Sequence, residues 1–197
     1  MKIILTRHGE TEENKNGTLQ GWKHGQLSSD GKKQAKLLAK KLKGVSIDIT
    51  YTSDLKRCLD TAKEIMMFHK KVCVIKEKLL RERGLGEFEG RKIGKSDWDA
   101  LPGDLYTNCP SGGETFEEVW ERLKLFYKQL LKKHTNETIL IIGHGGAQCL
   151  LQGIIENKGL RESFDLPKLD NTAISEFEIN ANGVVKAIGI NSVAHLD

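Results

Sequence analysis

Two histidines occupy equivalent places in the sequence. His8 follows the apolar run 2–6 and His144 follows the apolar run 138–142, and each is followed directly by glycine. A neighbouring glycine lets a ligand approach the backbone closely, so both positions favour a functional role. Three further histidines lack this setting and are interpreted as ordinary core or surface residues, namely His69, His134 and His195.

Cationic and acidic side chains accompany the two histidines. Arg7 is adjacent to His8, and Arg57 lies one turn into an expected helix, where a guanidinium can bind a phosphate through two hydrogen bonds. The segment after the third expected strand offers a carboxyl group, but spacing alone does not choose among its glutamates. The candidates are Glu77, Glu82, Glu87 and Glu89.

This set of side chains suits the chemistry of a phosphate monoester. Arginines and a second histidine form a cationic pocket for the phosphate dianion and for the charge on its oxygens in the transition state. A neutral imidazole is a good nucleophile toward phosphorus. A protonated carboxyl group can protonate the leaving alkoxide, and the resulting carboxylate can activate water to hydrolyse a phosphohistidine. This chemistry needs no metal ion and no cofactor.

The elements that must position these residues alternate between strands and helices. Strands are predicted over 2–6, 47–52, 72–75, 138–142, 173–179 and 184–190. Helices are predicted after the caps Ser28 to Asp30, after Ser53 or Asp54, from Thr115, and near Ala147. The segment up to Gln26 is interpreted as a long loop, and the Gly-rich segment 80–113 indicates no clear element.

This alternation predicts an α/β fold. We expect a single three-layer domain over 1–197, with a mostly parallel central sheet and helices on both faces. Parallel strands end at the same edge of a sheet, where open α/β folds bind their ligands. The candidate arginines, histidines and glutamate should therefore meet at that edge.

Composition excludes several classes of protein. The chain has 197 residues, of which 38% are hydrophobic and 29% charged, and this is typical of one soluble domain. The formal net charge of +4 is spread along the chain, so it does not indicate a nucleic-acid binder. No apolar run approaches the roughly 18 residues of a membrane span, and the first apolar run is too short for a signal peptide.

The cysteines indicate a reducing compartment. They are widely separated and form no CxxC pair, so free buried thiols are favoured over a disulfide framework or a zinc site: Cys58, Cys73, Cys109 and Cys149. A cytoplasmic protein is expected, either a monomer or a homodimer. Its partner should be a small phosphorylated metabolite, with neither nucleic acid nor membrane involved.

Four ordered blocks of the sequence resemble the histidine phosphatase superfamily, in its phosphoglycerate-mutase-like branch. The blocks are Leu5-Thr6-Arg7-His8-Gly9-Glu10-Thr11, Ser53-Asp54-Leu55-Lys56-Arg57-Cys58-Leu59-Asp60-Thr61-Ala62, Leu80-Arg81-Glu82-Arg83 and Gly143-His144-Gly145-Gly146. Shorter stretches also fit this family, namely Ser111-Gly112-Gly113-Glu114-Thr115 and Asn171-Thr172-Ala173. The resemblance covers nearly the whole chain.

The resemblance implies a role for each candidate. His8 would be phosphorylated and Glu82 would donate the proton, which selects Glu82 among the four glutamates. The residues implied to hold the phosphoryl group are Arg7, Arg57 and His144. Those implied to contact the ligand, the first through its side chain and the others through backbone groups, are Asn14, Gln20, Gly21 and Gly145.

The family contains both phosphatases and mutases. The glycolytic mutases carry a longer insertion after the acid block, whereas here only a short stretch separates Gly90 from Ser111, as in the phosphatase members. A shorter cover should leave a phosphohistidine more exposed to water, so hydrolysis is expected. A bisphosphoglycerate-dependent phosphoglycerate mutase is the alternative.

Other positions bear on which substrate is accepted. The family often has tryptophan immediately before Asn14, whereas this chain has Glu13, which would repel a substrate with several anionic groups. Cations that could bind a second phosphate or carboxylate are Lys23, His24, Arg83 and Lys92. These four are interpreted as solvated surface charges, the usual environment of such side chains.

Overall fold

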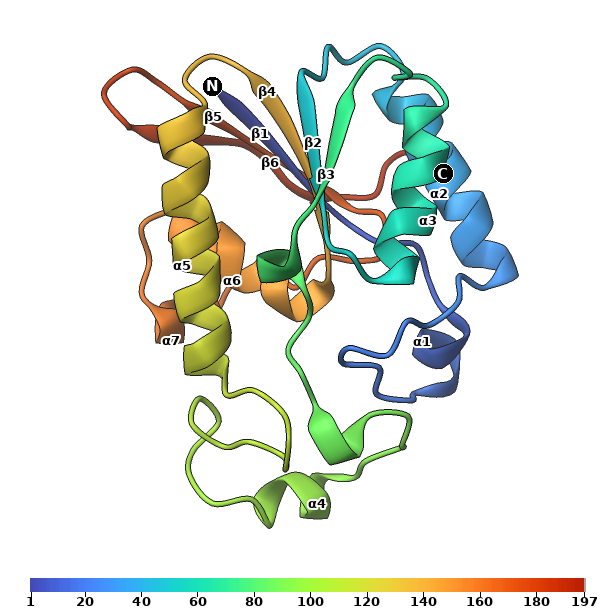
Figure 1. The fold of residues 1–197 in the computed structure, drawn as a ribbon, viewed down its shortest axis with the longest axis vertical. Coiled ribbons are helices and arrows are strands. Elements are labelled where there is room, and N and C mark those ends of the chain that lie inside the picture. The colour runs from blue at the N-terminus through green and yellow to red at the C-terminus, as the bar shows by residue number, and fades with distance from the viewer. Residues whose placement is uncertain (197) are drawn as a thin grey trace.

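A six-stranded sheet forms the centre of the computed structural model, which describes residues 1–196 (Figure 1). The strands are β1 (Lys2–Arg7), β2 (Ile49–Thr52), β3 (Cys73–Lys76), β4 (Thr138–Gly143), β5 (Ile174–Ile179) and β6 (Val185–Ser192), in the order β3-β2-β4-β1-β5-β6. Strands β1 to β4 run parallel, whereas β5 runs antiparallel to β1 and β6. The carboxyl ends of β1 to β4 therefore share one edge, as predicted.

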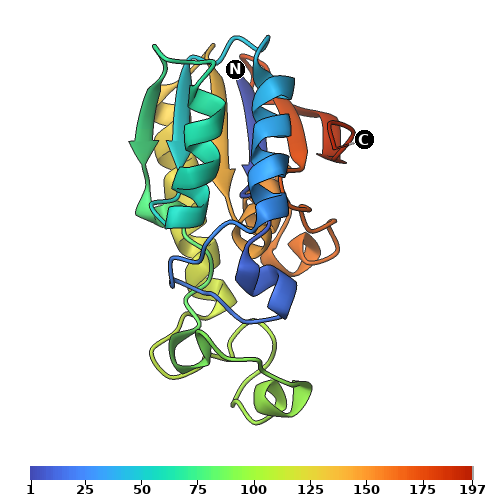
Figure 2. The same ribbon diagram turned by 90° about the vertical axis from the view of Figure 1, so that its right-hand side faces the viewer.

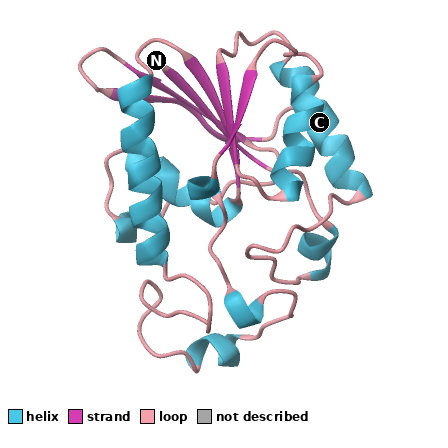
Figure 3. Ribbon diagram, viewed as in Figure 1, coloured by secondary structure: helices cyan, strands magenta, loops and turns pink. Residues whose placement is uncertain are grey.

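Helices cover both faces of the sheet, which confirms the predicted three-layer α/β architecture (Figure 3). Helices α2 (Ser29–Leu42) and α3 (Lys56–Met66) pack on one face, and α5 (Phe116–Lys133) and α6 (Gly145–Ile155) pack on the other. The short helices are α1 (Glu12–Asn16), α4 (Lys95–Asp99) and α7 (Leu160–Ser163). No helix within residues 1–196 is both long and apolar enough to cross a membrane. Asp197, the last residue of the predicted domain, lies outside the described residues.

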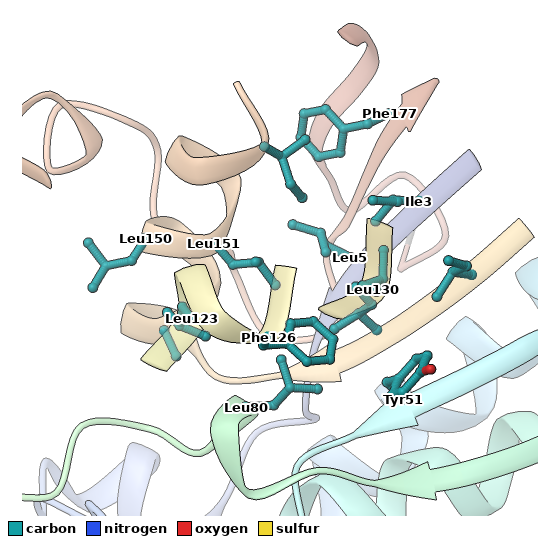
Figure 4. Close-up of a cluster of buried hydrophobic side chains, with 14 of the residues drawn as sticks. Ile3, Leu5, Tyr51, Leu80, Leu123, Phe126, Leu130, Leu150, Leu151 and Phe177 are labelled. Atoms are coloured by element: carbon teal, nitrogen blue, oxygen red, sulfur yellow. The ribbon is translucent and has the colours of Figure 1, made fainter. Parts of the chain in front are cut away.

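Two apolar cores, one on each face, explain why the central strands are unbroken apolar runs. In β1, Ile3 and Leu5 face the core beneath α5 and α6, whereas Ile4 faces the core beneath α2 and α3. Figure 4 shows the first of these cores, where the ring of Phe126 meets the ring of Tyr51 edge-on at a centroid distance of 5.5 Å. Successive strand side chains point to opposite faces, so a strand covered on both sides is apolar throughout.

The loop predicted up to Gln26 contains a helix, α1. Thr11 and Asn14 form a capping box at its start, in which each side chain accepts a hydrogen bond from the backbone N–H of the other. Such a box can stabilise a single helical turn without an apolar stripe. Because α1 buries no residue, hydrophobic spacing could not reveal it.

Helix α3 begins one or two residues later than predicted. Its N-cap is Leu55, which provides no side-chain cap, so the prediction of a Ser53 or Asp54 cap is wrong. Asp54 instead forms a two-pronged ion pair with Arg81, with distances of 2.7 and 2.6 Å. Ser53 and Asp54 thus bond residues far along the chain, His144 and Arg81 respectively, and a local capping rule does not predict such contacts.

The segment 80–113 extends beyond the carboxyl edge of the sheet (Figure 2). It contains α4 and the 3₁₀ turn Gly86–Phe88, and it contacts the first loop through backbone hydrogen bonds. The N–H of Leu19 donates to the carbonyl of Arg91 across 2.9 Å, and the N–H of Gly90 donates to the carbonyl of Leu19 across 2.7 Å. Residues of both segments line the cavity at the carboxyl edge of the sheet, where the candidate residues lie.

All four cysteines are free, as predicted. Cys58 and Cys149 are buried, whereas Cys109 is half-buried and Cys73 is exposed on the edge strand β3. The prediction of burial is therefore correct for two cysteines and wrong for Cys73. An edge strand has no neighbour on its outer side to cover it.

Candidate active site

His8 follows β1, and its buried ring has one nitrogen bonded to the backbone. Its backbone N–H donates to the carbonyl of Gly143 at the end of β4 across 3.1 Å. The ring Nδ1 lies 2.8 Å from the carbonyl oxygen of Gly9, which can only accept, so Nδ1 carries the proton and Nε2 keeps its lone pair. Burial, reinforced by the charges of Arg57 and Arg7, holds the pKa of His8 well below its usual value.

His144 lies behind the site, fully buried, with both ring nitrogens bonded. Arg57 donates from Nε to Nδ1 across 3.1 Å, so the proton of the ring is on Nε2, which donates to Ser53 Oγ across 2.9 Å. The ring centroid lies 5.2 Å from that of His8. Burial and the charge of Arg57 also hold the pKa of His144 well below its usual value.

Arg57 is the second residue of α3 and only 1% exposed. Its Nη1 donates to the carbonyl of Lys23 across 2.6 Å, and its Nη2 donates to the carbonyl of Gly21 across 2.9 Å. Within the described chain no carboxylate lies at ion-pair distance, so its positive charge is unneutralised. Each remaining N–H of this guanidinium is available to an anion.

Arg7 is the last residue of β1, directly before His8, and lines the same cavity. Its Nη1 donates to the carbonyl of Leu169 across 3.0 Å, while its buried Nε has no partner among residues 1–196. A buried N–H without an acceptor costs free energy, and an anionic ligand would satisfy it. Arg7 thus supplies a second, half-buried cation to the same site.

The carboxyl group of Glu82 contacts the first turn of α6, and Glu82 lines the same cavity. Its Oε1 accepts hydrogen bonds from the N–H groups of Arg83 and Ala147 (3.0 and 3.1 Å), and its Oε2 accepts one from Gly146 (3.1 Å). These bonds fix the carboxyl group in one orientation. Oε2 carries a single hydrogen bond and has room for a proton.

One cavity of about 490 Å³ connects most of the predicted residues. The predicted residues that line it are Arg7, His8, Asn14, Gln20, Gly21, Arg57 and Glu82. Gly145 lines an adjoining cavity of about 220 Å³ that also contains Arg7 and Glu82, whereas His144 lines neither. His144 contacts two residues that do line the larger cavity, Arg57 through a hydrogen bond and His8 through its ring.

Several residues of the site had no assigned role in the sequence. Ser53, expected as a helix cap, accepts from His144, and Asn171 donates from Nδ2 to the carbonyl of His8 across 2.9 Å. Arg83, expected at the surface, is 4% exposed and lines the cavity. Apolar side chains complete the wall, namely Leu85, Trp98, Leu105 and Phe116. Of these only Phe116 lies in a segment with a predicted element, the helix from Thr115.

The other three proposed surface cations differ from Arg83. Lys23, His24 and Lys92 are all exposed, and none of them lines the cavity. The Nζ of Lys23 donates to the carbonyl of Glu89 across 2.8 Å. The interpretation as surface charges is correct for these three and wrong for Arg83.

Comparisons with known proteins agree with this geometry. The family model of the histidine phosphatase superfamily (branch 1) matches residues 3–190. The probable phosphatase C1687.21 of Schizosaccharomyces pombe is 31% identical over 208 residues, which cover 100% of this chain and 96% of that protein. Phosphoserine phosphatase 1 of Hydrogenobacter thermophilus is 37% identical over 151 residues, covering 73% and 71%.

A solved structure shares the fold over its whole length. Bacillus stearothermophilus YhfR superposes with a TM-score of 0.88 at 27% identity, covering 100% of this chain and 99% of that one. The family and its phosphatase-named members confirm the predicted enzyme class, a phosphoric monoester hydrolase. With a family model that spans nearly all of its length, this chain belongs to the histidine phosphatase superfamily.

Proposed function

We propose that the protein hydrolyses phosphate monoesters of small metabolites through a phosphohistidine at His8, without a metal ion. The observation that carries this proposal is the state of the His8 ring. Its Nδ1 donates a hydrogen bond to the carbonyl of Gly9, so its Nε2 is unprotonated. The cavity that His8 lines also contains two arginines without a carboxylate partner. A neutral imidazole facing bound phosphate is the arrangement that nucleophilic phosphoryl transfer needs.

In the first step, Nε2 of His8 attacks phosphorus and the bond to the ester oxygen breaks. Protonated Glu82 gives its proton to that oxygen, which leaves as an alcohol. Nδ1 of His8 keeps its proton and continues to donate a hydrogen bond to the carbonyl of Gly9, so the positive charge that develops on the ring is stabilised by this hydrogen bond. The phosphoryl group is then held as a phosphohistidine.

In the second step, the Glu82 carboxylate removes a proton from a water molecule as its oxygen attacks phosphorus. The phosphorus–nitrogen bond breaks and its electron pair returns to Nε2 of His8. Inorganic phosphate leaves, and Glu82 is protonated again. Both steps use the same two side chains and regenerate them.

The charge of the transferring group is met by guanidinium groups. Arg7 and Arg57 both line the cavity, and each has N–H groups that its described hydrogen bonds leave free for phosphate oxygens. Asn14 and Gln20 line the same cavity, and the buried Oε1 of Gln20 has no partner among residues 1–196. We assign these two as ligand contacts, with Gly21 acting through its carbonyl on Arg57 and Gly145 lining the adjoining cavity.

The names of relatives support a small acidic metabolite as substrate. They include phosphoserine phosphatases of Hydrogenobacter thermophilus and Arabidopsis thaliana and an Entamoeba histolytica phosphoserine phosphatase solved with 3-phosphoglyceric acid. A cavity of about 490 Å³ accommodates a ligand of this size. The four free thiols fit a reducing cytoplasm, which we propose as the compartment.

A mutase is the second candidate, because relatives also include a Schizosaccharomyces pombe phosphoglycerate mutase, 32% identical over 99% of this chain. Incubation with 3-phosphoglycerate separates the two activities. Released inorganic phosphate supports hydrolysis, whereas the 2-phosphate isomer without phosphate release supports a mutase. A wider panel of phosphorylated metabolites, with His8→Ala as the blank, tests the proposed function. Phosphate release that His8→Ala retains would overturn the role of His8.

A further inference from the structure

Arg83 is a cation buried beside the site for which phosphoryl transfer gives no role. It follows Glu82 directly, is 4% exposed and lines the 490 Å³ cavity. Its Nε donates to the carbonyl of Glu114 across 2.7 Å, and its Nη2 donates to the carbonyl and to Oδ1 of Asn108 across 2.6 and 3.0 Å. None of its described hydrogen bonds uses Nη1.

The charge of Arg83 is also unneutralised. All its acceptors are carbonyl or amide oxygens, and among residues 1–196 no carboxylate lies within ion-pair distance. The carboxylate of Glu114, whose carbonyl accepts from Arg83, is itself paired: both its oxygens accept from Arg122, at 2.9 and 3.0 Å. A guanidinium buried without a counter-charge is costly, unless a ligand supplies the negative charge.

The walls around Arg83 hold it rigid and strengthen any ion pair that it forms. The ring centroid of Phe116 lies 4.1 Å from its guanidinium carbon, and that of Trp98 lies 5.6 Å away. Aromatic faces attract a cation and fix the plane of the guanidinium. They also exclude water, and two opposite charges attract each other more strongly where water is excluded.

The open donors of Arg83 fit a single negative charge. Nη2 and Nε are used by the protein, so only the two N–H groups of Nη1 remain for a ligand. The phosphate dianion, by contrast, has Arg7 and Arg57, with several free donors between them. A carboxylate matches a half-used guanidinium in both charge and number of acceptors.

We propose, on the basis of the proposed function, that Arg83 binds a carboxylate on the leaving group. The enzyme thereby selects phosphate monoesters of hydroxy acids over esters of neutral alcohols. Because Arg83 follows Glu82 in the chain, the carboxylate is bound next to the residue that protonates the ester oxygen. Lys168, an exposed residue at the same cavity, is screened by solvent and contributes little selectivity.

Matched pairs of esters test this proposal. In the first pair, 3-phosphoglycerate and glycerol 3-phosphate differ only in a carboxylate against a hydroxymethyl group. In the second pair, 4-carboxyphenyl phosphate and 4-(hydroxymethyl)phenyl phosphate place the same difference farther from the ester. We expect the wild type to prefer the acid in at least one pair by about ten- to a hundred-fold in kcat/KM, the effect of a hydrogen bond to a charged group.

Substitution of Arg83 should remove this preference. Arg83→Met should bring the two kcat/KM values of that pair within about three-fold, whereas Arg83→Lys, which keeps the charge, should retain part of the preference. Lys92→Met, which removes the same charge from the exposed surface, is the matched control and should keep the wild-type ratio. A ratio of two substrates is insensitive to partial unfolding, because unfolded protein hydrolyses neither.

A second measurement does not depend on whether Arg83→Met folds. The wild type should be inhibited at least ten-fold more strongly by 4-hydroxybenzoate than by 4-hydroxybenzyl alcohol if the second pair shows the preference, and likewise by glycerate over glycerol for the first pair. No preference in either pair, or a preference that Arg83→Met retains or Lys168→Met abolishes, overturns the proposal. Hydrolysis of 4-nitrophenyl phosphate that requires His8 would still stand in that case, so failure of the Arg83 proposal is distinguishable from failure of the proposed function.

Discussion

Arg57 donates from Nε to Nδ1 of His144 across 3.1 Å, so the two side chains act as one unit. Because Nδ1 accepts this bond, the other ring nitrogen, Nε2, carries the proton and donates a hydrogen bond to Ser53 Oγ. His144 does not line the cavity but fixes the plane of the guanidinium that does. We propose that its effect on a bound phosphate passes through Arg57.

Ser53→Ala should weaken this unit without removing any group from the cavity. The ring of His144 loses the acceptor that fixes its tautomer, so we expect kcat/KM to fall roughly three- to ten-fold, the effect of one neutral hydrogen bond. Thr50→Val is the control: it removes a hydroxyl of β2, the strand that Ser53 follows, and this Oγ1 is buried and unpartnered among residues 1–196. Steady-state kinetics of both variants check the prediction, and equal losses would contradict it.

Glu82→Gln should reveal the proton donor through the leaving group. An alkoxide needs protonation to leave whereas 4-nitrophenolate does not, so kcat/KM should fall by about a hundred-fold or more for alkyl esters and much less for 4-nitrophenyl phosphate. Glu87→Gln, an exposed glutamate of the same segment, should change neither. Equal losses on both classes of ester would exclude Glu82 as the acid.

Gly21→Ala should disturb the loop whose carbonyls hold Arg57. Gly21 has a φ of 49°, and an added Cβ would collide with Oε1 of Glu89, the oxygen that accepts from Trp22 N–H and Leu85 N–H. We expect KM to rise about ten-fold, as a hydrogen bond to a charged group is displaced.

The control for Gly21→Ala is Gly17→Ala. Gly17 also has a positive φ, 68°, but an added Cβ there meets no atom within 4 Å. This variant should cost about 1 kcal/mol of stability through backbone strain and leave KM unchanged. Urea unfolding and substrate titration of both variants separate strain from collision; a matching rise in KM for Gly17→Ala would show that strain alone is responsible.

The two buried histidines should make stability depend on pH. The pKa of His8 and that of His144 are lowered well below 6.5 by burial, so between those values and 6.5 the unfolded chain binds more protons than the folded one. The free energy of unfolding therefore rises with pH in this range. The contribution of the two histidines to stability is fully present above about pH 6.5 and is lost as the pH falls below that value.

Urea unfolding at pH 7.5 and 5.5 measures this dependence. Each histidine contributes a slope of up to about 1.4 kcal/mol per pH unit in this range. His8→Asn should reduce the slope, whereas His24→Asn, at an exposed site, should leave it unchanged. A slope that is the same in all three proteins would show that His8 is not buried in its neutral form.

Sequence reasoning predicted the sheet and the site residues that the sheet positions. The runs around Ile4 and Leu140 are apolar throughout because both faces of these strands are covered, and this signal is local. His8 and His144 follow those strands, so their meeting follows from parallel pairing. Where a side chain's place depends on neighbouring chain positions, the sequence was sufficient.

The remainder depends on contacts between distant segments. Arg83 is buried because Asn108 and Glu114 accept its hydrogen bonds and Phe116 covers it, and no spacing rule relates these positions. In the same way, Ser53 Oγ bonds a histidine 91 positions away as well as the N–H of Leu55 at the start of α3. The choice of Glu82 among four glutamates came from the family blocks, since all four lie in one polar stretch.

The hydrogen bonds of Arg57 join three stretches of chain that are far apart in sequence: residues 21–23, the start of α3 where Arg57 itself lies, and His144. Such a centre closes long loops, so it can form only after most of the chain has collapsed around the sheet. We therefore expect no fragment to retain activity and catalysis to appear in the last phase of refolding. Activity and the near-ultraviolet circular dichroism of the core should recover together, and activity that returned earlier would refute this order of events.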